Sequence, residues 1–131
     1  MSRLHHLALG ARDVESLAAF YRRQSKWDES FGIYEKIMKV APTELVAHLG
    51  WGAVSAASGK SLDRGERELK TFLASATIEK HGQANMAGAH FRLGTVYEKT
   101  ARKDLAKSEY NETLKINPKH ADARKALDAL K

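Results

Sequence analysis

The sequence predicts an all-α fold that is built from successive pairs of short helices. Apolar residues recur every three or four positions along most of the chain, and this spacing is typical of one face of an α-helix. Only two prolines interrupt the 131 residues, so helices are possible almost everywhere. The residues that precede the two prolines also match one another in order, which indicates that the helices repeat.

The repeat is located by the two prolines, Pro42 and Pro118. Leu93-Gly94-x-x-Tyr97, Ala106, Tyr110 and Ile116 precede Pro118, and Leu17-Ala18-x-x-Tyr21, Ser30, Tyr34 and Val40 precede Pro42 at the same spacings. Each place holds residues of similar size and chemistry in both segments. A middle segment fits the same register at Trp51-Gly52-x-x-Ser55, with Gly59 at the expected turn.

This register divides the chain into an N-terminal extension, three repeats and a cap. The extension covers residues 1–10, the repeats cover residues 11–44, 45–86 and 87–120, and the cap covers residues 121–131. The two outer repeats are equal in length and the middle repeat is longer. We place its extra residues mainly near residues 77–83.

In the first repeat, the apolar spacing predicts two helices joined by a turn. Val14, Leu17, Ala18 and Tyr21 mark the first helix, and Phe31, Tyr34, Ile37 and Met38 mark the second. Asp28 follows the turn and is predicted to cap the second helix by accepting hydrogen bonds from free backbone N–H groups. Pro42 is predicted to end that helix, because proline lacks the next N–H donor.

The middle repeat combines an uncharged first helix with an amphipathic second helix. Residues 45–57 contain no charged side chain, and the second apolar face consists of Gly65, Leu69, Phe72 and Leu73. In the third repeat Asp104 holds the capping place of Asp28. The final segment predicts a capping helix, in which Ala123, Leu127 and Leu130 cover the last helix pair.

Two glycines fall in the middle of predicted helices. Gly52 and Gly94 each cost about 1 kcal/mol there relative to alanine, so a packing reason is expected. We predict that the partner helix approaches these positions too closely for a side chain. Ala18 holds the same place in the first repeat.

The third repeat carries a recognisable motif. Leu93-Gly94-x-x-Tyr97, Ala106, Tyr110 and Pro118 resemble the tetratricopeptide repeat, whose pattern runs Trp-x-x-Leu-Gly-x-x-Tyr, then Ala-x-x-x-Phe, then Pro. The resemblance covers residues 11–131, and the middle repeat matches poorly in its second half. It implies a right-handed solenoid of helix pairs, whose first helices line a concave groove, and a protein-binding scaffold that is not an enzyme.

The first helix of each repeat would supply the residues that face a partner in this groove. These residues are Arg12, Glu15, Ala19 and Arg22 in the first repeat, Val46, Leu49 and Ala53 in the second, and Phe91, Arg92, Thr95 and Glu98 in the third. The set predicts a groove that is apolar around Leu49 and Phe91 and basic at one end. We expect it to bind a peptide or helix of a partner protein that has an apolar anchor and some acidic character.

Other interpretations of these residues stay open. Leu49 and Phe91 can instead pack between neighbouring repeats. The chain can also be a structural segment of a larger solenoid, or a homo-oligomer that associates through Leu4, Leu7 and Leu9. The carboxylate clamp with which some tetratricopeptide proteins hold chaperone C-termini is not expected, because only Arg92 matches the residues that it requires.

Charge and composition narrow the class of partner. The 22 basic and 16 acidic residues give a net charge of +6, but the two signs are interspersed, which is typical of solvated helix faces and argues against nucleic acid. No stretch approaches the roughly 18 apolar residues of a membrane span. Residues 1–11 lack the pattern of a signal peptide, and there is no cysteine, so we expect a cytoplasmic protein.

No motif predicts catalysis, a metal or a cofactor. Gly59-Lys60-Ser61 resembles the end of a phosphate-binding loop, but Val54 stands where that loop needs a glycine. The six histidines lack the spacing of metal ligands, and His48 and His90, at equivalent places, are expected to pack. Residues 4–21 resemble the opening of glyoxalase-like metalloenzymes, with His5 and His6 on a first strand, but the rest of the chain predicts helices.

Overall fold

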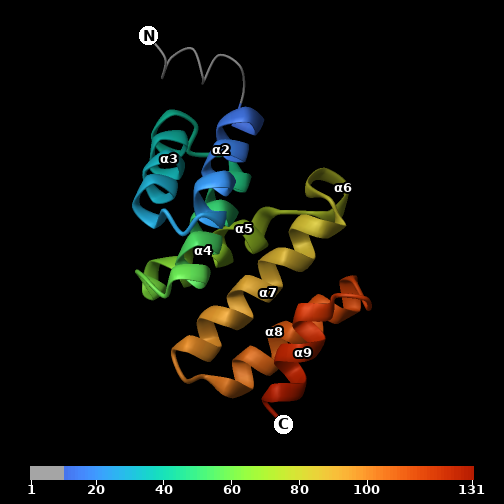
Figure 1. The fold of residues 1–131 in the computed structure, drawn as a ribbon. Helices are drawn as coiled ribbons and strands as arrows, with labels where there is room; N and C mark the ends of the chain where they lie inside the picture. The colour runs from blue at the N-terminus through green and yellow to red at the C-terminus, as the bar shows by residue number, and fades with distance from the viewer. Residues whose placement is uncertain (1–10) are drawn as a thin grey trace.

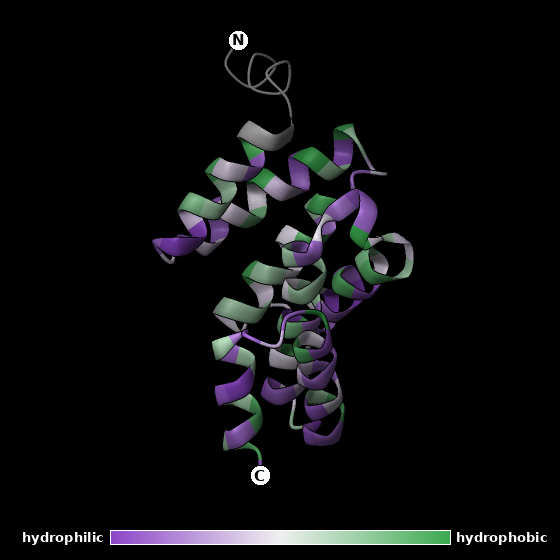
Figure 2. Cartoon of the chain, turned by 90° about the vertical axis from the view of Figure 1, so that its right-hand side faces the viewer, coloured by the Kyte–Doolittle hydropathy of each residue, from purple (hydrophilic) through white to green (hydrophobic). Residues whose placement is uncertain are grey.

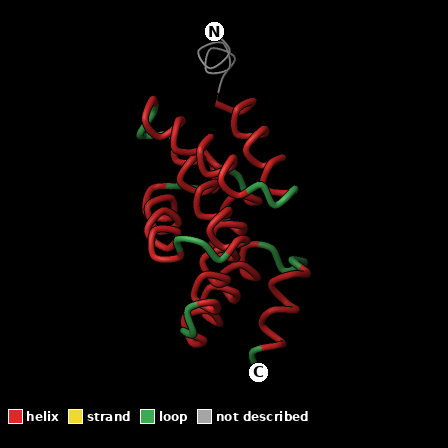
Figure 3. Tube along the Cα trace, turned by 60° about the vertical axis from the view of Figure 1, so that its left-hand side comes forward, coloured by secondary structure: helices red, strands yellow, loops and turns green. Residues whose placement is uncertain are grey.

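A computed structural model describes residues 11–131 as an all-α fold (Figure 1). The helices are α2 (Ala11–Arg23), α3 (Trp27–Val40), α4 (Leu45–Ser58), α5 (Leu62–Ser75), α6 (Ile78–His81), α7 (Gln83–Lys99), α8 (Lys103–Ile116) and α9 (Ala121–Ala129). The described part contains helices and loops but no strand (Figure 3). The all-α prediction is therefore confirmed over these residues. The predicted extension, with its histidines and leucines, lies outside them.

The helices pack mainly as consecutive pairs. The most extensive contacts join α7 with α8, α4 with α5, and α2 with α3, which we call the third, second and first pairs. The second helix of each pair also contacts the first helix of the next, as α3 does with α4 and α5 with α7. Figure 1 shows the pairs following one another from α2 to the C-terminal α9, which packs on α8. This packing is consistent with a helical repeat.

The bounds of the helices follow the register of the two prolines. Helices α3 and α8 begin and end at equivalent positions before Pro42 and Pro118, and helices α4 and α9 begin at equivalent positions after them. The short helix α6 lies where the sequence predicted the extra residues of the middle repeat. Local signals in the sequence therefore locate most helix boundaries.

The predicted aspartate caps are wrong. The N-cap residues of α3 and α8 are Lys26 and Arg102, and neither helix has a side-chain hydrogen bond at its cap. Asp28 and Asp104 lie too far along the chain, inside the first helical turn. A carboxylate there still favours the positive end of the helix dipole, so both residues retain an electrostatic role.

The predicted close approach at the two mid-helix glycines is confirmed. A Cβ atom added at Gly52 would collide with the side chain of Leu69 on α5, and one added at Gly94 would lie 2.7 Å from Cε1 of Tyr110 on α8. A third close approach was not predicted. A Cβ at Gly50 would collide with the ring of Tyr34, which belongs to the preceding pair.

The core follows the contacts between pairs. One cluster joins the first and second pairs through Tyr34, Ile37 and Val54, and another joins the second and third pairs through Leu69 and Val96. Full burial of each such side chain stabilises the fold by about 1.5–3 kcal/mol. Colouring by hydropathy shows hydrophobic and hydrophilic segments alternating along the helices (Figure 2), as amphipathic helices require. Within the described residues, no helix has the length and apolar character needed to span a membrane.

Ion pairs connect the second helices of consecutive pairs. Arg64 on α5 donates two hydrogen bonds to the carboxylate of Glu35 on α3, at 2.6 and 2.8 Å. These bonds hold the pKa of Glu35 below its ordinary value. Arg102, just before α8, donates to Glu66 on α5 at 2.7 Å. Each pair is thus linked to the one before it by charge as well as by apolar contact.

Candidate partner-binding face

The residues predicted to face a partner lie on α2, α4 and α7, which contact one another in that order. We call this set the first-helix face. Most of its side chains are half-buried, and Glu98 is exposed. The side chain of Arg12 is not among those that the structure describes.

The burial of Ala53 contradicts its predicted role in facing a partner. It is only 4% exposed, so its methyl group offers almost no surface to a partner. Helix α4 contacts α2, α3, α5 and α7, and these neighbours enclose a small side chain at this position.

Leu49 and Phe91 have packing roles of their own. Leu49 packs against two core clusters, one around Leu93 and one around Phe72. The centre of the Phe91 ring lies 5.7 Å from that of Tyr110 and 5.0 Å from that of His120, which is the N-cap residue of α9. These contacts agree with the packing interpretation of both residues. Both keep partial exposure, so only part of each side chain is available to a partner.

Arg22 and Arg92 belong to different helix pairs, and the positive charge of Arg22 acts on Arg92. Burial lowers the pKa of Arg92, and the nearby charge of Arg22 lowers it further, while Asp122 on α9 opposes this. Arginine remains protonated in proteins, so the shift measures an unfavourable position of the cation and not a loss of charge. Among the side chains of residues 14–131, neither guanidinium forms an ion pair.

The acidic residues of the first-helix face are held by buried tyrosines. The hydroxyl of Tyr110 donates to Oε1 of Glu98 at 2.7 Å, and that of Tyr34 donates to Oε1 of Glu15 at a weaker 3.4 Å. Burial, with the adjacent carboxylate, raises the pKa of both tyrosines. Glu15 and Glu98 therefore help to hold the first and third helix pairs together.

His48 and His90 do more than fill space. Nδ1 of His90 lies 2.7 Å from Oε1 of Glu109, and His48 pairs in the same way with Glu68. Both contacts join the first helix of a pair to its second helix. In the first pair the corresponding positions hold Val14 and Ile33, which pack against an apolar cluster. The repeat register indicated equivalent histidines, but their matching glutamates were not recognised.

These histidines do not form part of a metal cluster. Over residues 11–131, no group of three or more histidine, aspartate or glutamate side chains has an arrangement that could hold a metal ion. His5 and His6, on which the glyoxalase-like resemblance depends, lie outside that part of the chain.

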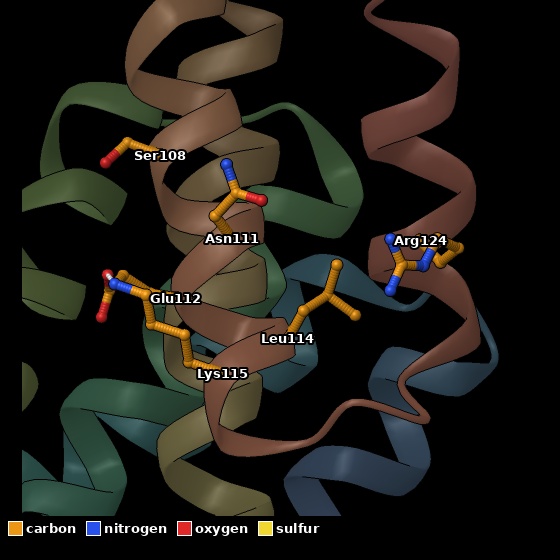
Figure 4. A pocket seen from close by; sticks show the side chains of 6 residues that line it. All are labelled: Ser108, Asn111, Glu112, Leu114, Lys115 and Arg124. Atoms are coloured by element: carbon orange, nitrogen blue, oxygen red, sulfur yellow. Dashed lines mark hydrogen bonds and ion pairs between the residues drawn. The ribbon is translucent and has the colours of Figure 1, made fainter.

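The structure also contains a shallow hollow on a different surface (Figure 4). It has a volume of about 520 Å³ and lies between α8 and α9. Its lining consists of Ser108, Asn111, Glu112, Leu114, Lys115 and Arg124. None of the predicted partner-facing residues lines it, and no sequence pattern indicated it. Most of its side chains are exposed, and Lys115 already pairs with Glu112 at 2.9 Å.

Comparison with known proteins adds no family. No protein-family model matches the chain, and no curated protein sequence matches it significantly.

Proposed function

We propose that this chain is a tetratricopeptide-like scaffold that binds an acidic segment of a partner protein on its first-helix face. The observation that carries the proposal is the unfavourable position of Arg92, a half-buried cation whose pKa is lowered by burial and further by the charge of Arg22 on another helix pair, and only partly restored by Asp122. The proposal assigns no catalytic step to the chain.

The repeat supports the scaffold part of the proposal. The recurrence of helix bounds and the close contacts at Gly52 and Gly94 are what a stack of similar helix pairs requires. In such a stack the first helices lie next to one another, and this arrangement offers an extended surface to one ligand. The contacts of α4 with both α2 and α7 agree with that expectation.

The charges support the acidic character of the ligand. Two guanidinium groups that repel one another are stabilised when a carboxylate binds between them, and arginine suits carboxylates because its fork can bind both oxygens. Glu15 and Glu98 accept hydrogen bonds from tyrosines, and among the side chains that the structure describes neither forms an ion pair with Arg22 or Arg92. The exposed parts of Leu49 and Phe91 would hold an apolar residue of the same ligand.

The absence of cysteine fits a reducing compartment, and we therefore place the scaffold in the cytoplasm. We expect its partners to be proteins and not nucleic acid, because the basic residues are interspersed with acidic ones over the helix surfaces.

A peptide library displayed on phage tests the ligand class. We expect the selected peptides to carry Asp or Glu within one helical turn of a large apolar residue. Arg22→Gln and Arg92→Gln should each weaken the binding of a selected peptide at least tenfold in fluorescence anisotropy, with a loss that grows as salt falls. These arginines are better targets than Leu49 and Phe91, whose core contacts would confound the result.

Arg67→Gln is the matched control, because Arg67 is exposed on α5 and its loss changes the net charge equally. It should leave the affinity within about twofold. Circular dichroism should show equal helicity for all three variants. A library without acidic binders, or binders that ignore both arginine substitutions, would refute the proposal.

A further inference from the structure

Two large apolar side chains of α2 are exposed on one face. Leu17 is 37% exposed and Phe20 is 47% exposed, and their spacing along the helix makes them neighbours on its surface. Single exposed apolar residues are ordinary on protein surfaces. This pair is unusual because the side chains at the equivalent positions of the other two helix pairs are buried.

The corresponding positions in the other two pairs are buried. The counterparts of Leu17 and Phe20 are Trp51 and Val54 on α4, and Leu93 and Val96 on α7. Trp51 and Leu93 are 4% and 3% exposed, and both valines are fully buried. In the repeat register, Leu17 and Phe20 therefore hold positions that are buried against a preceding helix in the other two pairs.

The side chains that cover these counterparts come from the preceding helix pair. The ring of Phe31 on α3 lies 4.5 Å from that of Trp51. Leu69 on α5 belongs to the same core cluster as Val96, and Leu73 packs against that cluster. In both cases the cover is one amphipathic helix. Among the described helices, none precedes α2 to cover it in this way.

Lys26 lies at the edge of this face, and its counterpart in the third pair, Arg102, forms an ion pair with the preceding helix pair. The guanidinium of Arg102 lies 4.7 Å from the centre of the Tyr97 ring and donates to Glu66 on the preceding pair at 2.7 Å. In the first pair, Nζ of Lys26 lies 5.9 Å from the centre of the Tyr21 ring. No carboxylate among the described side chains of residues 14–131 forms an ion pair with Lys26. A helix that covers α2 should therefore bring an acidic residue as well as apolar ones.

We propose that Leu17, Phe20 and Lys26 form a docking face for an amphipathic helix of a second protein, which packs on α2 as α5 packs on α7. By analogy with Glu66, Leu69 and Leu73, this helix carries an acidic residue at position i and large apolar residues at i+3 and i+7. Phe20 and Arg22 are two residues apart on α2 and therefore lie on opposite sides of that helix, so this face and the first-helix face can be occupied at once.

A second copy of this chain fits the face less well than such a helix. The apolar faces of α3 and α5 are already packed within the molecule. The outer side of α9 is polar, with Arg124, Lys125 and Asp128 exposed. The other large apolar residues that are exposed among the described side chains, Val40, Ile78 and Leu105, have no carboxylate three positions before them.

A helical peptide with the sequence of residues 61–76 is a direct probe, because α5 covers the equivalent positions of α7. Titration into the full-length, ¹⁵N-labelled protein should shift the amide signals around Leu17, Phe20 and Lys26. Phe20→Ser should weaken binding at least tenfold. Leu105→Ser is the matched control, because Leu105 is also 47% exposed but lies on α8, and it should change the affinity less than twofold.

The peptide provides a second control. Its variant with Glu66→Lys and Leu69→Ser should bind at least tenfold more weakly than the parent peptide. Absence of shifts on α2 at millimolar peptide, or shifts on α7 that report exchange with the native α5, would overturn the proposal. So would nuclear Overhauser contacts from Leu4, Leu7 or Leu9 to the Phe20 ring in the free protein, or a dimer in sedimentation that Phe20→Ser abolishes.

Discussion

The two ends of the helix array differ in the surface that they present. At the C-terminal end, α9 places Ala123, Leu127 and Leu130 against the third pair and leaves polar side chains outside. At the N-terminal end of the described chain, α2 leaves Leu17 and Phe20 in solvent. Certain positions in each repeat are apolar because they pack against the neighbouring repeat. At the last repeat of an array these positions have no neighbour, so they leave an apolar surface exposed unless polar residues replace them. The C-terminal helix makes this replacement, and α2 does not.

Removal of the cap should give the largest effect. A chain that ends at residue 120 loses the cover that Leu127 and Leu130 provide, and we expect the free energy of unfolding to fall by about 4 kcal/mol. The opposite end supplies the contrast, since Leu17→Ser with Phe20→Ser should cost about 1 kcal/mol or less. Urea unfolding followed by circular dichroism measures both. Equal losses at the two ends would contradict the difference between them.

An intermediate effect should come from the joint inside the third pair. Gly94→Ala places a methyl group 2.7 Å from the Tyr110 ring, and overpacking of this kind costs about 1–3 kcal/mol. Gly32→Ala, on α3, meets no atom within 4 Å and should instead stabilise by up to about 1 kcal/mol through helix propensity. Thermal unfolding of the two variants should therefore shift in opposite directions. A shared direction would show that Gly94 is not a contact point.

The smallest effect concerns the bond between helices within a pair. His90→Val removes the partner of the half-buried Glu109 and should cost about 1–2 kcal/mol. Adding Glu109→Ile recreates the apolar pairing of Val14 with Ile33 in the first pair and should recover most of that loss. A double-mutant cycle in urea gives the coupling, for which we expect about 1 kcal/mol. Additive single losses would argue against a direct interaction.

The sequence predicted the helices well because their signals are local. Apolar spacing, Pro42, Pro118 and the mid-helix glycines each act within a few residues or one helix contact. The same signals placed the extra residues that form α6. At Asp28 and Asp104 the error was a small shift along the chain, which removes a capping role although the helix itself was predicted correctly.

The candidate site was harder to predict because it depends on residues that are distant in the chain. The burial of Ala53 results from the surrounding helices; the uncharged segment 45–57 is consistent with it, but the repeat register assigned Ala53 to the side that faces a partner. The charge of Arg22 acts on Arg92 although the two residues belong to the first and third repeats. The glutamate partners of His48 and His90 lie on another helix, so the repeat revealed the histidines but not the bonds that they form.

The contacts between neighbouring helices also have a consequence for how the chain folds. All the extensive contacts join helices that are close in sequence, so little loop entropy opposes their formation and folding should be fast. Each pair can form before the next is complete, and during synthesis α2 and α3 are the first described helices to emerge. Throughout the time in which the rest of the array is built, no later helix of the described chain covers the Leu17 and Phe20 surface.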